Sequence, residues 1–200
     1  GLFAIWCLAA PVAALRPRWF HRWQAFILRL WGRSVAWCLG VRVTVQGRPP
    51  SRPFFLVSNH LSYLDIVVYA TQVGGMFVSK AEVQQWPGLG RISRAMGTIF
   101  IDRTSKRDAL RTLARIRDVV ELGGGVVVFP EGTSTAGADV LPFKPALLDY
   151  AARRQFPVTV ARITYATAEG DPPPHLAVCW WGTMTFLPHA TRLASLRGVQ

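Results

Sequence analysis

The stretch SNHLSYLD, residues 58–65, brings together two side chains that suit acid–base chemistry, His60 and Asp65. An aspartate that accepts a hydrogen bond from one imidazole nitrogen fixes the tautomer of the ring and raises the basicity of the other nitrogen. That second nitrogen can then remove the proton of a hydroxyl group. The pair indicates a general base, although the same residues also suit a loop histidine followed by an aspartate that complements a helix dipole.

The spacing of the pair predicts a turn between its members. Positions five apart in one helix are separated by roughly 140°, so His60 and Asp65 cannot share a helical face. Ser62, with Asp65 three residues later, suits the N-cap and capping box of a helix. We therefore expect His60 in a loop and Asp65 in the first turn of the helix that follows.

Arg103 follows the stretch GTIFID, where a strand is expected to end. A guanidinium group at such a position can bind a phosphate through two parallel hydrogen bonds. The alternative is a surface ion pair with Asp102 or Asp108, which would contribute little.

The stretch FPEGTST places Glu131 and Gly132 directly after another apolar run. Gly132 lets the backbone approach a ligand closely, and Thr133, Ser134 and Thr135 supply hydroxyl groups. The alternative is a polar turn in which Glu131 pairs with an arginine.

Apolar runs and amphipathic stretches alternate beyond residue 40. Strands are predicted for residues 41–46, 54–57, 76–79, 98–101, 126–129, 158–165 and 175–182. Helices are predicted for residues 64–73 and 105–122. This order predicts an α/β fold, in which a single domain has a mixed or parallel central sheet flanked by helices.

The candidate residues follow three separate strands. His60 comes after residues 54–57, Arg103 after residues 98–101 and Glu131 after residues 126–129. In open α/β sheets, sites form beyond the carboxyl ends of the strands. The sequence therefore predicts one site at this edge.

The first 40 residues differ from the rest and are expected to associate with a membrane. Residues 1–15 carry no charge but are too few to cross a bilayer, which indicates an anchor or a truncated span. Arg18, Arg22, Arg29 and Arg33 then share one face of a predicted helix, with Trp, Phe and Leu on another. This pattern is typical of a helix lying in a membrane interface, and also of an ordinary amphipathic helix that covers a core.

Composition supports contact with anionic lipid. The net charge is +12, with 20 arginines among 23 basic residues and with 8 tryptophans, which are enriched at bilayer headgroups. No helix-turn-helix, RNP or zinc pattern favours nucleic acid as a partner. Three scattered cysteines predict neither a disulfide framework nor a metal site, and they suit the cytoplasmic face of an inner or plasma membrane.

Four stretches, NHLSYLD, GTIFIDR, FPEGTST and FPVTVARITY, resemble the ordered blocks of the glycerolipid acyltransferases. The resemblance covers residues 54–165 and is strongest for the 1-acylglycerol-3-phosphate (lysophosphatidate) acyltransferases. It implies that His60 is the general base, that Asp65 orients it and that Arg103 binds the phosphate of the acceptor.

The resemblance extends to further substrate-binding residues. It implies that Glu131 and Gly132, with Thr133 beside them, help to form the acceptor site. Lys80 and Lys144 resemble family positions near the headgroup. Residues 41–200 would then form an α/β acyltransferase domain, which we expect to be truncated at its C-terminus.

The implied reaction moves a fatty acyl group from coenzyme A or acyl-carrier protein to the free hydroxyl of a lysophospholipid. The first candidate acceptor is 1-acyl-sn-glycerol-3-phosphate, which gives phosphatidic acid, and lyso-ornithine lipid or another lysolipid is the alternative. No cofactor, metal or acyl-enzyme is expected, because the chain lacks a Gly-x-Ser-x-Gly elbow and the four blocks contain no cysteine.

Two other functions suit the same residues. A hydrolase would use the His/Asp pair with water, and a non-catalytic membrane-binding paralogue would need no base. The fourth block also departs from the family pattern, because Val160, Ala161 and Arg162 stand where a proline-containing stretch is usual, and an arginine there could change the choice of headgroup.

Overall fold

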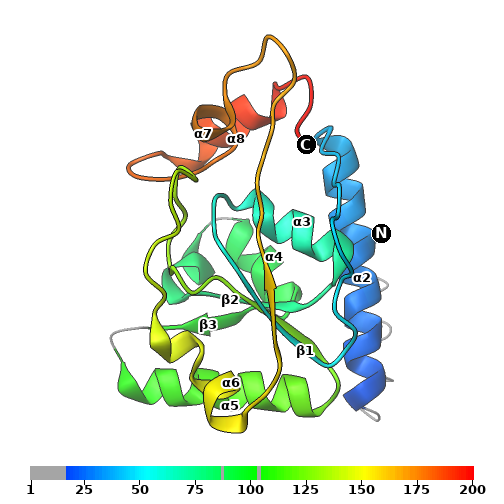
Figure 1. Cartoon of the computed structure of the whole chain (residues 1–200), viewed down its shortest axis with the longest axis vertical. Coiled ribbons are helices and arrows are strands. Elements are labelled where there is room, and N and C mark those ends of the chain that lie inside the picture. Colours follow the sequence, from blue (N-terminus) through cyan, green and yellow to red (C-terminus); the bar gives the residue numbers. More distant parts are fainter. Residues whose placement is uncertain (1–16, 87, 103–104) are drawn as a thin grey trace.

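The computed structural model describes residues 17–86, 88–102 and 105–200. Its centre is a parallel sheet with the strand order β3-β2-β4-β1-β5 (Figure 1). The strands are β1 (Phe54–Ser58), β2 (Met76–Lys80), β3 (Ile99–Ile101), β4 (Gly125–Val128) and β5 (Val158–Ala161). The sheet is thus parallel rather than mixed, and β1 lies between β4 and β5, with Leu56 opposite both Val127 and Thr159.

Helices cover both faces of the sheet (Figure 1). They are α2 (Pro17–Cys38), α3 (Leu64–Gln72), α4 (Leu89–Ala95), α5 (Lys106–Glu121), α6 (Asp149–Arg154), α7 (Pro174–Ala177) and α8 (Phe186–Ala194), with short 3₁₀ turns η1 (Ala81–Gln85) and η2 (Pro145–Leu147). Successive residues of a strand point to opposite faces. Accordingly, Phe55 and Val57 of β1 pack in the core under α5 and α6, whereas Phe54 and Leu56 pack in the core on the side of α2 and α3.

Two predicted strands are absent. Residues 41–46 form only an isolated bridge between Val41 and Val199, because Val41 and Val43 pack against the end of α2 and the C-terminal segment instead of joining the sheet. Residues 175–182 were also predicted as a strand, but they contain most of α7 followed by loop. Pro174 at the start of α7 explains the difference, since the fixed φ of proline suits the first helical turn.

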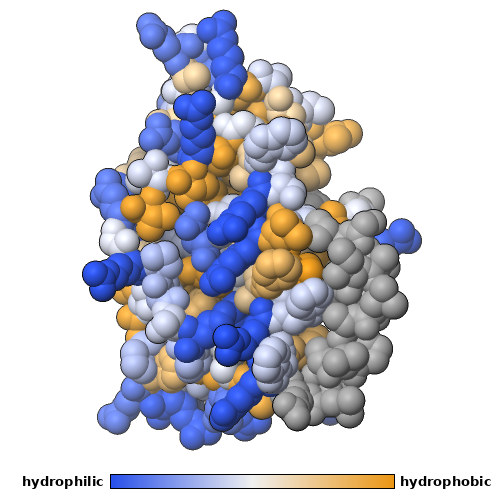
Figure 2. All heavy atoms as spheres, turned by 90° about the vertical axis from the view of Figure 1, so that its right-hand side faces the viewer, coloured by the Kyte–Doolittle hydropathy of each residue, from blue (hydrophilic) through white to orange (hydrophobic). Residues whose placement is uncertain are grey.

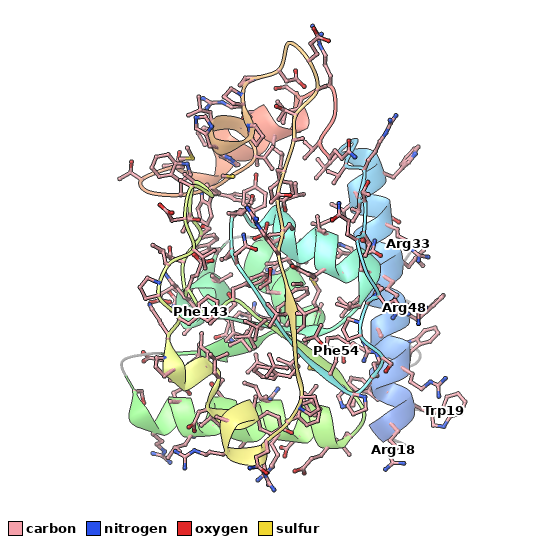
Figure 3. The ribbon with its side chains drawn as sticks, viewed as in Figure 1. Arg18, Trp19, Arg33, Arg48, Phe54 and Phe143 are labelled. Atoms are coloured by element: carbon pink, nitrogen blue, oxygen red, sulfur yellow. The ribbon has the colours of Figure 1, made fainter. Side chains whose placement is uncertain are left out.

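The long helix α2 packs against α3 and presents its other side to solvent. Figure 2 shows hydrophilic and hydrophobic side chains interleaved on that side, and Figure 3 shows Arg18, Trp19 and Arg33 projecting outward. The exposed large apolar side chains of α2 are Trp19, Phe26, Leu30 and Trp37. In the part of the chain that the structure describes, no helix is both long enough and apolar enough to cross a membrane. The prediction for residues 1–15 lies outside the described residues.

Candidate active site

The histidine and the aspartate of the first block touch each other. His60 lies in the loop after β1, and its Nδ1 is 2.7 Å from Oδ2 of Asp65. Helix α3 begins at Leu64, so Asp65 lies in its first turn. Ser62 Oγ accepts a hydrogen bond from the Leu64 N–H (3.3 Å), and Asp65 Oδ2 accepts one from the Ser62 N–H (3.1 Å). The predicted turn is therefore present, but the N-cap residue is Tyr63 and not Ser62, which lies one residue earlier.

The carboxylate of Asp65 is fully buried, and protein groups donate several hydrogen bonds to it. Besides the contact with His60 and Ser62, it accepts hydrogen bonds from the Leu61 N–H (2.7 Å) and from the hydroxyl of Tyr165 (2.6 Å). Burial, and next the negative charge of Asp65, raise the pKa of Tyr165 well above its usual value, so the phenol stays protonated and donates. An ionised Asp65 places the imidazole proton on Nδ1 and leaves Nε2 as the basic nitrogen.

One face of the His60 ring packs against an aromatic ring, and the side chain remains partly exposed. It stacks on Phe129, which follows β4, with 4.2 Å between ring centroids and 16° between planes. Its side chain is 20% exposed, and its Nε2 has no hydrogen-bond partner within residues 17–86, 88–102 and 105–200. The residue lines a cavity of about 400 Å³, a size typical of small-molecule sites.

Glu131 fixes the position of the His60 loop from β4. Its carboxylate is buried, with Oε1 accepting the His60 N–H (2.7 Å) and Oε2 accepting the Leu141 N–H (2.8 Å). The Thr135 N–H also donates to the carbonyl of His60 (3.0 Å). Gly132 has φ 73°, a left-handed conformation that favours glycine and turns the backbone toward the cavity.

The cavity combines aromatic walls with a few polar groups. Besides His60 and Phe129, it is lined by Val78, Ser79, Lys80, Glu82, Val83, Trp86, Gly132, Thr133, Ser134, Trp180, Trp181 and Gly182. Trp86 and Trp180 meet edge to face with 5.6 Å between their ring centroids, and Ser134 donates a hydrogen bond to the carbonyl of Trp180. Such a wall suits an apolar chain next to a polar reacting group.

Most of the predicted site residues gather at this edge of the sheet. Those that line the cavity or bind residues that line it are His60, Asp65, Lys80, Glu131, Gly132 and Thr133. Lys144 is exposed and is not among the lining residues, although its N–H donates to the carbonyl of Pro130 (2.8 Å). Arg103 lies outside the described residues. Among the described side chains, no three His, Cys, Asp or Glu come together as a metal site.

Sequence reasoning missed several side chains of the site. Tyr165 lies within the fourth block, but no spacing rule links a tyrosine to an aspartate 100 residues away. Phe129 and Trp180 fall within predicted strands, and Trp86 lies outside every predicted element, so none of the three is identified as a site residue. The concentration of tryptophan in the chain was the one signal, and it pointed to membrane contact rather than to a cavity wall.

Comparison with known proteins adds the family. The model of the Acyltransferase family matches residues 41–164. A lyso-ornithine lipid O-acyltransferase of Rhodobacter capsulatus is 38% identical over 185 residues, which cover 88% of this chain and 64% of that protein. A 1-acyl-sn-glycerol-3-phosphate acyltransferase of Neisseria meningitidis is 36% identical over 123 residues, 60% of this chain and 48% of that protein.

A solved structure shares the fold. The crystal structure of the 1-acyl-sn-glycerophosphate acyltransferase PlsC from Thermotoga maritima superposes with a TM-score of 0.55 at 22% identity, covering 89% of this chain and 76% of that one. The chain spans less than two thirds of the length of the R. capsulatus relative. Because the family model matches more than half of its residues, the chain belongs to the Acyltransferase family.

Proposed function

We propose that the protein transfers a fatty acyl group from a thioester to the free hydroxyl of a lysolipid. The observation that carries the proposal is the contact between His60 and Asp65 beside a cavity with aromatic walls. Family membership supports the reaction class, and the relatives named above are acyltransferases of lysolipids.

In the proposed step, Nε2 of His60 removes the proton of the acceptor hydroxyl while its oxygen attacks the thioester carbonyl. The tetrahedral intermediate then expels the thiolate of the donor, coenzyme A or acyl-carrier protein, and the imidazolium returns the proton to that sulfur. Asp65 stabilises the imidazolium, because its buried carboxylate lies 2.7 Å from Nδ1. No covalent acyl-enzyme and no cofactor are required.

The charges that line the cavity favour an acceptor headgroup that carries both signs. Lys80 and Glu82 line it from the end of β2 and from η1, and both side chains are exposed to a ligand. An ornithine headgroup offers a carboxylate to the first and an ammonium to the second. The R. capsulatus relative, whose printed name specifies lyso-ornithine lipid, also matches a larger share of this chain than the N. meningitidis relative.

A phosphate headgroup is the second candidate. The relative from N. meningitidis is named for 1-acyl-sn-glycerol-3-phosphate, and the resemblance of GTIFIDR to the family assigns phosphate binding to Arg103. For either acceptor, we propose that Gly132 and Thr133 contact the substrate. Glu131 would act by holding the two loops together, because both of its oxygens accept backbone hydrogen bonds.

The first test replaces the base. His60→Ala should lower kcat for acyl transfer by about 10²- to 10⁴-fold, the usual contribution of a general base. His175→Ala is the matched control, because His175 is exposed and lies outside the cavity. Wild-type transfer by the His60 variant, measured with a panel of lysolipids and both donor types, would exclude the mechanism.

The second test separates the two acceptors by the sign of the effect. Glu82→Gln should lower kcat/KM for lyso-ornithine lipid about twofold to fivefold, since an exposed charge pair contributes about 1 kcal/mol or less. The same change should raise kcat/KM for lysophosphatidate, because it removes a repulsive charge. Glu169→Gln, an exposed acid outside the cavity, is the control. A loss with lysophosphatidate would contradict the assignment of Glu82.

We also propose that the protein works at a membrane, at the cytoplasmic face. The exposed tryptophans of α2 and the net charge of +12 support binding to an anionic bilayer, and no feature of the site favours nucleic acid.

A further inference from the structure

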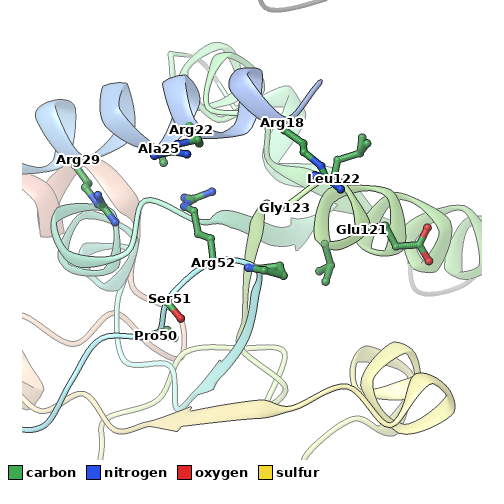
Figure 4. Close-up of a pocket in the computed structure, with 12 residues that line it drawn as sticks. Arg18, Arg22, Ala25, Arg29, Pro50, Ser51, Arg52, Glu121, Leu122 and Gly123 are labelled. Carbon is green, nitrogen blue, oxygen red and sulfur yellow. The ribbon is translucent and has the colours of Figure 1, made fainter. Parts of the chain in front are cut away.

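A second cavity, of about 710 Å³, lies at the amino ends of the strands, whereas the candidate active site lies at their carboxyl ends. It opens between α2, the loop that precedes β1 and the turn that follows α5, at the amino ends of β1 and β4 (Figure 4). Four arginines line it, namely Arg18, Arg22, Arg29 and Arg52, and we call this cavity the arginine pocket. Three of them come from α2, and Arg52 rises toward them from the β1 loop (Figure 4).

Backbone carbonyls hold the side chain of Arg52 in place beside the pocket. Its guanidinium donates hydrogen bonds to the carbonyls of His21 (3.3 Å), Val73 (3.1 Å) and Gly74. The Nε atoms of Arg29 and Arg52 are buried and have no hydrogen-bond partner among the described residues. Burial, and next the charge of Arg29, lower the pKa of Arg52 to about 10.

No carboxylate of the chain balances these charges. The stretches that the structure leaves undescribed, residues 1–16, 87 and 103–104, contain no Asp or Glu. Among the described residues, Glu121 is the one acid that lines the arginine pocket, and its ion pair is with Arg154 (3.5 Å). Four guanidinium groups therefore face one cavity without an ion pair to any described carboxylate.

The chemistry of the pocket selects a phosphate group. Guanidinium groups bind phosphate oxygens through paired hydrogen bonds, and they do so at a lower desolvation cost than ammonium groups. Trp19 and Phe26 are exposed on the same helix, 64% and 55% respectively, where they can enter the headgroup layer of a bilayer. A phosphate presented by a bilayer would meet the arginines and these aromatic side chains together.

We propose that the arginine pocket binds the phosphate of an anionic phospholipid and so holds the protein on the membrane at a defined site. This role goes beyond the proposed acyl transfer, because the bound lipid is neither acceptor nor product. It also differs from the attraction of a basic surface to a charged bilayer, in which every exposed arginine contributes alike.

The test compares two arginines of α2. Arg22 and Arg33 are both exposed and lie eleven residues apart, which places them within about 20° of each other around the helix. Arg22 lines the pocket and Arg33 does not. Binding of the purified chain and of its Arg22→Gln and Arg33→Gln variants is measured by co-sedimentation with phosphatidylcholine vesicles that contain phosphatidylglycerol.

A defined site predicts unequal losses. Removing a charge-assisted contact to phosphate should weaken binding roughly 10- to 100-fold for Arg22→Gln. Removing a charge near an anionic surface should weaken it only about fivefold for Arg33→Gln. Arg18→Gln, a second exposed pocket variant, should behave like Arg22→Gln, which guards against a folding defect in one variant. Equal losses in the pocket variants and in Arg33→Gln would overturn the proposal.

Inorganic phosphate separates the two possible sources of the phosphate group. If a soluble anion is the true ligand, phosphate will raise the Tm of the wild-type chain and all variants will bind vesicles alike, and the lipid assignment is then wrong. Vesicle binding is measured without turnover, so its outcome is independent of whether the proposed acyl transfer is correct.

Discussion

Asp65 is the residue on which the candidate site depends. An ionised carboxylate that is fully buried is costly unless its lone pairs are satisfied, and here two backbone N–H groups, an imidazole and a phenol satisfy them. Three of these donors come from residues 60–62, next to the aspartate. The phenol of Tyr165 comes from the segment after β5, so it couples that segment to the pair of His60 and Asp65.

Replacing Tyr165 tests this coupling. Tyr165→Phe should lower the free energy of unfolding by about 1.5–3 kcal/mol, since it removes a hydrogen bond to a charged, buried group. It should also lower kcat more than it changes KM, because in the proposed mechanism the carboxylate positions the base and does not bind the acceptor. Denaturant unfolding and steady-state kinetics measure the two effects.

Tyr150→Phe is the control for this change. Tyr150 is buried in the core under α5, and its hydroxyl has no hydrogen bond among the described residues. Its removal should alter stability and kcat only slightly. Equal effects of the two changes would mean that Tyr165 acts through packing alone.

At this scale the sequence predicts what is local. The five-residue spacing of His60 and Asp65 excludes a shared helical face, so a contact between them requires a turn, and the structure has both. The buried role of Glu131 does not follow, because a glutamate in a polar turn equally suits an exposed ligand contact. Its burial results from the approach of the His60 loop, which only the assembled sheet brings close.

At the scale of elements, the packing of α2 on α3 depends on Gly32. A Cβ atom at this position would lie 2.8 Å from the backbone nitrogen of Thr71 and 2.9 Å from the Cβ of Ala70. Backbone and Cβ atoms cannot move aside as the end of a flexible side chain can. The two helices therefore approach each other as closely as they do because this residue has no side chain.

Gly32→Ala distinguishes packing from helix propensity. In an exposed helix this change would stabilise the protein by about 1 kcal/mol. Overpacking costs about 1–3 kcal/mol, so we expect a net loss of up to about 2 kcal/mol in the free energy of unfolding. Ser34→Ala, on the exposed side of α2, should instead be neutral or slightly stabilising. A more stable Gly32→Ala variant would show that the helices separate at little cost.

The sequence predicts the strands that are buried on both faces, but it is wrong for the alternating residues 41–46. Residues 54–57, 76–79, 98–101 and 126–129 are almost entirely apolar runs, as a parallel sheet covered on both faces requires, and each overlaps a strand of the structure. Residues 41–46 alternate as a half-buried strand does. Their apolar side chains are buried by helix α2 and the C-terminal segment, and periodicity alone cannot identify the partner.

At the scale of the whole molecule, the parallel sheet separates two sites of different charge. Its carboxyl edge carries the His60 cavity, with one lysine and one glutamate on its lining, and its amino edge carries the arginine pocket. The sequence predicts the arginine row of α2. It does not predict that Arg52 lies beside this row, because that depends on how the loop before β1 packs against the helix. Both sites thus combine a local pattern with one distant residue, Tyr165 in the first and Arg52 in the second.

Stability also depends on pH through two buried histidines, His21 and His189. Burial lowers the pKa of each below the usual 6.5. A hydrogen bond with Gln24 raises the pKa of His21 and one to the carbonyl of Cys179 raises that of His189, whereas the charges of Arg52 and Arg192 lower them. A histidine with a lowered pKa in the folded state binds fewer protons there than in the unfolded state. Its contribution is therefore complete above about pH 6.5 and is lost as the pH falls.

We expect the free energy of unfolding to fall between about pH 7.5 and 5.5, by at most about 1.4 kcal/mol per pH unit for each histidine. Repulsion within a chain of net charge +12 also grows as histidines become protonated, but roughly 1 M salt screens it to about 3 Å. The slope of the free energy of unfolding against pH that remains in high salt then reports the lowered pKa of the buried histidines. His189→Gln should make that slope shallower, whereas His175→Ala, at an exposed position, should leave it unchanged. Equal slopes in all three proteins would show that His189 binds protons equally in the folded and unfolded states, and the lowered pKa assigned to it would then be wrong.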